Sequence, residues 1–195
     1  MSRPVYIRSI VCLGAEDPDF RQVFSPLEAR RMGRLLKRAV WASQKAMEAA
    51  QTTMPDAIVT ATDFGSMRES EAFLGALRSG GETSPRPTNF MQSTHNTIGS
   101  LIAIRLGCHG YNTTYSHKGS SFRSALTDAW MQVSTGEADT VLAGWFDEDF
   151  PPSGSADHAV SLVITASPEG AVGPLSREML SLPDEDLLGT LLENR

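Results

Sequence analysis

The sequence of 195 residues has little cysteine and no long apolar run. Its two cysteines, Cys12 and Cys108, form no CxxC pair and are too few for a disulfide framework, so we expect two small buried side chains. No window approaches the roughly 20 apolar residues that a membrane helix needs, and residues 1–7 lack the apolar stretch of a signal peptide. These absences predict a cytoplasmic protein without a membrane span.

An excess of positive charge is also missing. The 17 Lys and Arg residues against 23 Asp and Glu residues give a net charge of −6, which repels phosphate backbones and argues against nucleic-acid binding. With 41% hydrophobic residues the chain has the composition of a soluble protein with one core. We expect a main domain at residues 1–167, followed by an acidic tail at residues 168–195 that docks as a terminal helix or stays mobile.

Several motifs that define common enzyme sites are absent. The four histidines, at positions 95, 109, 117 and 158, show no HExxH or i, i+4 spacing, so no metal site is expected. No GxxxxGK[ST] or GxGxxG sequence follows a predicted strand, so no cofactor is expected either. His95 and His117 lie in polar loops, where a functional role and a hydrogen bond to a loop carbonyl are equally compatible with the sequence.

What the sequence does contain is an alternation of strand and helix patterns, which predicts a layered α/β architecture. Apolar, β-branched segments predict strands at residues 5–13, 56–62, 111–116, 140–144 and 158–166. Apolar residues at helical spacing predict a long helix starting at Ser25, which can form a capping box with Glu28, and further helices at 69–77, 98–106 and 122–133. In the helix predicted at residues 69–77, we expect Phe73, Leu74 and Leu77 to point inward.

Two clusters of charged residues are expected to be solvated. Asp147, Glu148 and Asp149 follow a buried strand and are interpreted as surface acids. The predicted long helix carries a basic run, for which a solvated helix face is favoured over a docking surface for an acyl carrier protein: Arg30, Arg31, Arg34, Lys37 and Arg38.

The strand, turn and helix over residues 111–125 form the place where an α/β enzyme would hold a nucleophile, because a helix N-terminus lowers thiol pKa values and stabilises oxyanions. The turn contains no cysteine and does not match GxSxG. A hydrolase would need Ser116 or Ser120 together with a nearby histidine and acid, and this reading is disfavoured. The residues of this turn, called the elbow below, are Ser116, His117, Lys118, Gly119 and Ser120.

Residues 134–144, STGEADTVLAG, resemble the helix, turn and strand that follow the active-site elbow in β-ketoacyl synthases of the thiolase fold. In this register residues 118–121 match the family's elbow, with Gly119 at the position of the acyl-accepting cysteine, and residues 96–104 and 63–66 match its asparagine-containing loop and Gly-rich turn. More narrowly, residues 92–97 and 107–112 resemble chain-length-factor-like proteins encoded beside aryl polyene and dialkylresorcinol pigment genes.

The resemblance runs from about residue 5 to residue 166 and covers only the N-terminal half of the family. It implies a thiolase-like fold with a central mixed sheet, and no catalytic residue, because both the cysteine nucleophile and the two histidines of the C-terminal half are missing. It also implies that Phe90, His95, Asn96 and residues 117–120 line an acyl tunnel. The strand that would pair antiparallel with its counterpart across a dimer comprises Tyr111, Asn112, Thr113, Thr114 and Tyr115.

The function implied is that of a non-catalytic subunit. It would form a heterodimer with an active β-ketoacyl-ACP synthase and shape its acyl tunnel in polyene, polyketide or fatty-acid biosynthesis, with acyl carrier protein as a further partner. Two alternatives stay open. One is an enzyme that acts on acyl thioesters with His117 and Ser116 or Ser120, and the other is a homodimeric binding module.

Overall fold

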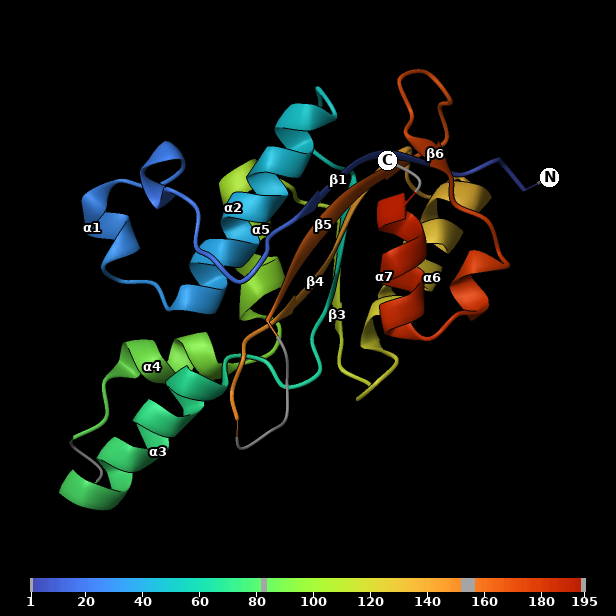
Figure 1. Ribbon diagram of the computed structural model, residues 1–195. Coiled ribbons are helices and arrows are strands. Elements are labelled where there is room, and N and C mark those ends of the chain that lie inside the picture. Colours follow the sequence, from blue (N-terminus) through green and yellow to red (C-terminus); the bar gives the residue numbers. More distant parts are fainter. Residues whose placement is uncertain (1, 82–83, 152–156, 194–195) are drawn as a thin grey trace.

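The computed structural model describes residues 2–81, 84–151 and 157–193, and its centre is a six-stranded mixed sheet in the order β3-β2-β4-β5-β1-β6 (Figure 1). Strand β2 is parallel to its neighbours β3 and β4, whereas the β4–β5, β5–β1 and β1–β6 pairs are antiparallel. The predicted α/β class and mixed sheet are therefore confirmed. The strands are β1 (Tyr6–Cys12), β2 (Ala57–Ala61), β3 (Tyr111–Tyr115), β4 (Thr140–Asp147), β5 (His158–Thr165) and β6 (Gly173–Pro174).

Helices cover both faces of the sheet (Figure 1). One face packs against α2 (Arg34–Ala49) and α5 (Thr97–Leu106), and the other packs against α6 (Ser121–Thr135) and α7 (Asp184–Glu193). In β2 the side chains alternate between these two cores, with Val59 on the α6 side and Ile58 on the α2 side. This double burial explains why the central strands are continuous apolar runs in the sequence.

The helix predicted to start at Ser25 is interrupted, so the prediction of one long helix was wrong. The capping box of Ser25 and Glu28 does form, but α1 (Pro26–Ala29) ends after one turn and α2 begins only after Gly33. The side chain of Gln92 accepts a hydrogen bond from the Gly33 N–H at 2.8 Å and donates one to the Arg31 carbonyl. These bonds satisfy backbone groups that a continuous helix would have paired internally.

Helices α3 (Met67–Gly80) and α4 (Pro87–Ser93) form a hairpin that projects from the end of the sheet (Figure 1). The inward orientation expected for Leu74 and Leu77 was wrong, because their side chains are 59% and 38% exposed. The Phe73 ring instead packs on the Phe90 ring of α4, with centroids 5.3 Å apart. The hairpin therefore lies beside the core and not over it.

The C-terminal segment docks on the sheet as a helix. Leu187, Leu188 and Leu191 of α7 are buried in the core on the α6 side. Two short 3-10 helices, Phe20–Gln22 and Met179–Ser181, complete the described elements. No helix within the described residues is long and apolar enough to cross a membrane.

Candidate functional site

The elbow connects the end of β3 to the start of α6. Gly119 adopts a left-handed conformation with φ +80°, which glycine reaches without steric cost. The Ser120 N–H donates to the His117 carbonyl at 2.7 Å, and the His117 N–H donates to the Ser121 Oγ at 2.8 Å. These bonds hold Ser116, His117, Lys118 and Gly119 in exposed positions at the end of the sheet, while Ser120 is half-buried.

The turn that follows β2 packs against the elbow. The Asp63 carboxylate accepts hydrogen bonds from the Gly119 N–H at 3.1 Å and from the Ser121 hydroxyl. The Lys118 ammonium lies 5.1 Å from the centre of the Phe64 ring. The His95 ring lies against Gly65, where an added Cβ would come within 3.4 Å of His95 Cδ2. The structure thus brings together the elbow, the 63–65 turn and His95.

Asp147, at the end of β4, holds the 63–65 turn from inside the protein. Its carboxylate accepts hydrogen bonds from the Thr62 hydroxyl, the Asp63 and Phe64 N–H groups and the Trp145 indole, all within 3.0 Å. Burial raises the pKa of Asp147, and the hydrogen bonds from the two backbone N–H groups and Thr62 only partly oppose this rise.

The expectation of solvated acids was therefore wrong for Asp147 and Glu148, which are 1% and 3% exposed. The predicted strand ended at residue 144, but β4 continues to Asp147 and carries its side chain inward, and the next residue, Glu148, accepts a hydrogen bond from the Arg68 N–H. The apolar Trp145 and Phe146 were the signal in the sequence that the strand is longer.

Asp184 of α7 caps the N-terminus of α6. Its carboxylate accepts hydrogen bonds from the Phe122 N–H at 2.9 Å and the Arg123 N–H at 3.0 Å, while the N-cap residue Ser120 makes no side-chain capping bond. The Asp63 and Asp184 carboxylates therefore accept hydrogen bonds from the N–H groups to which an anionic ligand at this helix end would bind. Sequence reasoning missed both aspartates, because they lie far from residues 119–123 in the chain.

The His117 ring contacts Ser124 and not Ser116 or Ser120, the two serines predicted from the sequence to act with it. Its Nδ1 lies 3.3 Å from the Ser124 Oγ, and its ring makes an edge contact with Tyr115 at 5.8 Å. The Ser120 hydroxyl donates to the His117 carbonyl, and the Ser116 hydroxyl makes a long 3.5 Å contact with the Asp63 carbonyl. Both hydroxyl groups thus face backbone oxygens.

The predicted interface strand lies at the edge of the sheet, where β2 is the only neighbour of β3 among the described residues. The Tyr111 and Tyr115 hydroxyls both donate to Asp128 of α6, at 2.9 and 3.2 Å. Partial burial and the Asp128 charge raise the pKa of Tyr115 to about 12. Exposed Ile104 of α5 and Met131 of α6 lie on the helices that flank this strand.

Asn112 and Thr114 hold β3 from the opposite face. The Asn112 amide donates to the Gly99 carbonyl at 3.1 Å, and the Thr114 and Thr60 hydroxyls are 2.8 Å apart. Thr113 is half-buried. Hydrogen-bonding side chains on both faces therefore fix β3 and leave its outer edge unpaired within the described chain.

Two predicted tunnel residues lie outside the contacts described for the elbow. Phe90 belongs to α4, where its ring packs on Phe73, and Asn96 is exposed just before α5. No group of three or more His, Cys, Asp or Glu side chains in the described part of the chain is placed to hold a metal ion. The site is thus the elbow with the 63–65 turn, and the free edge of β3.

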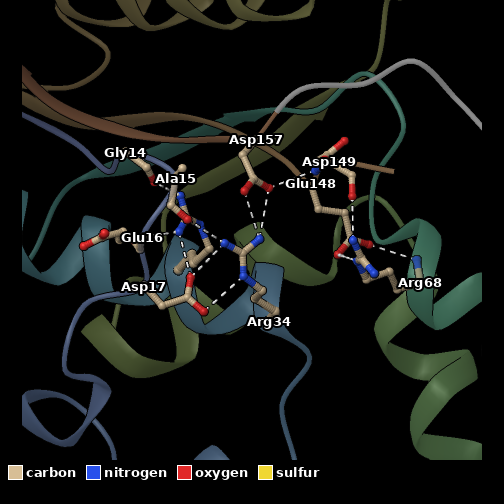
Figure 2. Close-up of polar contacts among 10 residues, drawn as sticks. Gly14, Ala15, Glu16, Asp17, Arg34, Arg68, Glu148, Asp149 and Asp157 are labelled. Atoms are coloured by element: carbon tan, nitrogen blue, oxygen red, sulfur yellow. Dashed lines mark hydrogen bonds and ion pairs between the residues drawn. The ribbon is translucent and has the colours of Figure 1, made fainter. Parts of the chain in front are cut away.

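The basic run is not one solvated face, which corrects that expectation. The Arg38 side chain is 1% exposed and forms an ion pair with Asp17 at 2.7 Å. Arg34 pairs with Asp17 and Asp157 at 3.0 Å (Figure 2). Partial burial raises the pKa of Asp17, but its bonds with both arginines outweigh burial and hold the pKa below its ordinary value. Arg30 and Arg31 are exposed as expected.

The sequence matches the family "Beta-ketoacyl synthase, N-terminal domain" over residues 11–169, which is more than half of the chain. The chain therefore belongs to the β-ketoacyl synthase family, as the sequence predicted. Its fold is the thiolase-like fold of the ketosynthase N-terminal domain. A comparison with curated proteins found no match.

Solved structures with this fold include assemblies of ketosynthases. The type II PKS acyl-carrier protein in complex with its ketosynthase, AntDE:AntF, has a TM-score of 0.74 at 15% identity and is matched over 89% of this chain and 66% of that chain. The ishigamide ketosynthase/chain length factor has a TM-score of 0.69 at 16% identity, over 85% of this chain and 59% of that chain. This chain thus spans less than two thirds of the length of either.

A third structure is the ketosynthase ApeO in complex with its chain length factor ApeC from Xenorhabdus doucetiae. It has a TM-score of 0.69 at 18% identity and is matched over 83% of this chain and 79% of that chain. At such low identities the similarity establishes the fold that is shared, and the assembly states belong to those proteins.

Proposed function

We propose that this chain is a non-catalytic, chain-length-factor-like subunit. It pairs through β3 with an active β-ketoacyl-ACP synthase and shapes the acyl tunnel of that enzyme in polyene, polyketide or fatty-acid biosynthesis. The observation that carries the proposal is the chemistry of the elbow. The position that the resemblance assigns to the nucleophile is Gly119, which has no side chain to accept an acyl group.

The surroundings of Gly119 support the same conclusion. Acyl transfer requires N–H donors that are free to stabilise a developing oxyanion. Here the Gly119 N–H already donates to the Asp63 carboxylate, and the first N–H groups of α6 donate to Asp184. Negative charge at these donors opposes a thiolate or an oxyanion, so the elbow keeps the shape of a catalytic turn without its electrostatics.

The free edge of β3 supports pairing with another subunit. An exposed edge strand is a template for strand addition, and natural proteins cover or blunt such edges. In this chain the edge carries no proline or lysine, and exposed Ile104 and Met131 lie on the helices beside it. His95, Asn96, Phe90 and the elbow are then the proposed tunnel-lining residues.

Acyl carrier protein is the proposed second partner. A groove of about 300 Å³ between the α1–α2 connection and α4 is lined by Arg30, Arg31 and Arg86, together with one acid, Glu69, and polar Thr88 and Asn89. Three exposed guanidinium groups around one groove attract an acidic partner, even though the whole chain carries a net charge of −6.

The alternative of an enzyme acting on acyl thioesters receives less support from the geometry. A general base must lie within hydrogen-bond reach of the hydroxyl that it activates. The His117 ring contacts Ser124, while the Ser116 and Ser120 hydroxyls contact backbone carbonyls. An acyl-thioester hydrolysis assay on the isolated chain tests this alternative, and we expect no turnover above that of a His117→Ala variant.

Co-expression tests the main proposal. The chain is produced with each full-length ketosynthase of the source organism that has an elbow cysteine, and the complexes are weighed by native mass spectrometry. We expect a one-to-one complex with one of them, and products of altered chain length when this chain is omitted. A stable complex of the chain with itself alone, or unchanged products, would contradict the proposal and favour the homodimeric binding module.

A further inference from the structure

Glu148 is a buried carboxylate at the junction of β4, α2 and α3. It follows β4 directly and is 3% exposed. Its carboxylate accepts a hydrogen bond from the Arg68 N–H at 2.9 Å and pairs with the Arg68 guanidinium at 3.4 Å (Figure 2). Burial raises the pKa of Glu148, and the hydrogen bond from the Arg68 N–H and the Arg68 charge only partly oppose this rise. Because burying a carboxylate costs free energy, stability alone does not explain its position.

The first turn of α3 is held by the two residues that follow β4. The N-cap residue of α3, Ser66, makes no side-chain capping bond, and Glu148 accepts the Arg68 N–H instead. The Arg68 guanidinium also donates to the Asp149 carbonyl at 2.7 Å (Figure 2). The start of α3 is therefore tied to the end of β4 through polar bonds.

These bonds matter because the junction is incompletely packed. A cavity of about 20 Å³ lies between the first turns of α2 and α3, and Glu148 is among its lining residues. This volume is enough for one water molecule. No residue of α3 or α4 is buried, and at the far end of the hairpin Gln92 bonds to the backbone at Arg31 and Gly33. The orientation of the hairpin thus depends on polar contacts at its ends and not on a packed core.

A shift of α3 at Arg68 would reach a residue that is proposed to line the acyl tunnel. Arg68 and Phe73 belong to the same helix, and the Phe73 ring packs on the Phe90 ring of α4 with centroids 5.3 Å apart. Phe90 is one of the proposed tunnel-lining residues. Because a helix moves as a unit, a tilt of α3 about the Glu148 contact displaces Phe90 relative to the sheet.

The elbow is held separately, by the residue before Glu148. Asp147 accepts the Asp63 and Phe64 N–H groups, and the Asp63 carboxylate accepts the Gly119 N–H of the elbow. Two consecutive acids at the end of β4 therefore hold the elbow and the hairpin. Their common origin in one strand fixes the distance between these two sides of the proposed tunnel.

We infer that Glu148 is a positioning residue for chain-length selection. It holds α3, and with it Phe90, in one orientation relative to the elbow, so that the tunnel of the partner enzyme accepts a narrow range of acyl chains. The inference rests on the proposed function and adds the residue that makes the selection sharp.

The first measurement is hydrogen exchange in the isolated chain. Glu148→Ala should raise amide exchange in residues 67–74 by about tenfold, because the first turn of α3 loses its acceptor. Glu148→Gln should raise it less than about threefold, because the amide oxygen still accepts the Arg68 N–H. Glu137→Ala is the control, since Glu137 is exposed and precedes β4, and unchanged exchange in α6 shows that each variant is folded. If residues 67–74 exchange equally in Glu148→Ala and the unmodified chain, the inference is overturned.

The second measurement is the product lengths of the ketosynthase identified by co-expression, saturated with each variant. We expect Glu148→Ala to lower the share of the main product by roughly half and to add neighbouring chain lengths, because a hairpin that samples several orientations selects less sharply. Glu148→Gln should restore most of the main product. Weaker assembly alone would be compensated at saturation, so it does not produce this change.

The outcomes separate the inference from the proposed function. If α3 loosens while Glu148→Ala and Glu137→Ala give the same products, the inference is overturned and the proposed function stands. If no ketosynthase binds the unmodified chain, or its omission leaves the products unchanged, the proposed function has failed and the inference fails with it.

Discussion

The sheet and the α3–α4 hairpin differ in where their apolar side chains go. In β4, seven of eight residues are buried, whereas no residue of α3 or α4 is buried. The sheet is enclosed by helices of its own chain on both faces, but the hairpin makes its contacts at its ends and along its own two helices. The sheet is stabilised by contacts within its own chain, whereas the apolar side chains of the hairpin are exposed and available for association.

The largest expected effect is on stability and comes from a change in the core that packs on the sheet. Phe122 is fully buried and its ring stacks on Trp145 with centroids 5.1 Å apart. Phe122→Ala leaves a cavity in the core and should lower the free energy of unfolding by about 3–5 kcal/mol. Denaturant titration measures this, with Met54→Ala as the exposed control, and a loss below about 1 kcal/mol would contradict the described core.

A slightly smaller effect is expected at the buried side chain of Arg38. Arg38 donates to the carbonyls of Gly14 and Glu16 and to the Asp17 carboxylate. Arg38→Met keeps the apolar volume but removes the donor of the Gly14 and Glu16 carbonyls and leaves Asp17 with Arg34 alone, so the free energy of unfolding should fall by about 3 kcal/mol. The exposed Arg21→Met, which loses an ion pair with Asp19 at the surface, should cost less than about 1 kcal/mol in the same titration.

A side chain at Gly119 of the elbow should destabilise the protein through the backbone conformation of this residue. An added Cβ at Gly119 meets no atom within 4 Å, so conformation alone opposes a side chain there. Gly119→Ala should destabilise the protein by about 1–2 kcal/mol, because a left-handed conformation is costly for residues other than glycine. Gly14→Ala, which also meets no neighbouring atom and has no positive φ, is the control for thermal unfolding. Equal effects of the two changes would argue against the described turn.

The fold should lose stability in acid partly through Asp17, which pairs with Arg34 and Arg38. The pKa of Asp17 is held below its ordinary value of about 3.9, so its stabilisation is present above about pH 4 and is lost as the pH falls through the folded-state pKa. Asp17→Asn should flatten the fall of Tm between pH 5 and pH 2. The exposed Asp139→Asn, which loses an ion pair with Arg3, should leave that slope nearly unchanged. A slope that is the same in Asp17→Asn and the unmodified chain would refute this assignment.

The smallest effect is expected in the hairpin of the isolated chain. Leu74→Ala removes a side chain that is mostly in water, so the free energy of unfolding should change by less than about 0.5 kcal/mol. Denaturant titration of the chain alone measures this. A loss above about 2 kcal/mol would mean that Leu74 is covered by its own chain, and the contrast between hairpin and sheet would disappear.

The comparison also separates what could be predicted. The strands β2, β4 and β5 were predicted because residues buried on both faces leave continuous apolar runs, although β4 extends beyond the predicted residue 144. Strand β6 was not predicted, and α6 was predicted from its apolar spacing. Leu74 and Leu77 were misplaced because the same helical spacing serves a core or a partner, and spacing does not say which. The break at Gly33 depends on Gln92, which is distant in the sequence and whose role no local pattern indicates.

The sequence by itself determined the α/β class, the family and the position of the turn between β3 and α6, because these depend on local patterns and on residue identity. Only the tertiary structure decided that Asp63 and Asp184 occupy the N–H groups of the elbow and α6, and that Asp147 and Arg38 are buried. It also decided that β3 lies at the edge of the sheet. The reason is physical: a charged side chain is equally compatible with solvent and with a buried partner until the fold brings that partner within hydrogen-bond distance.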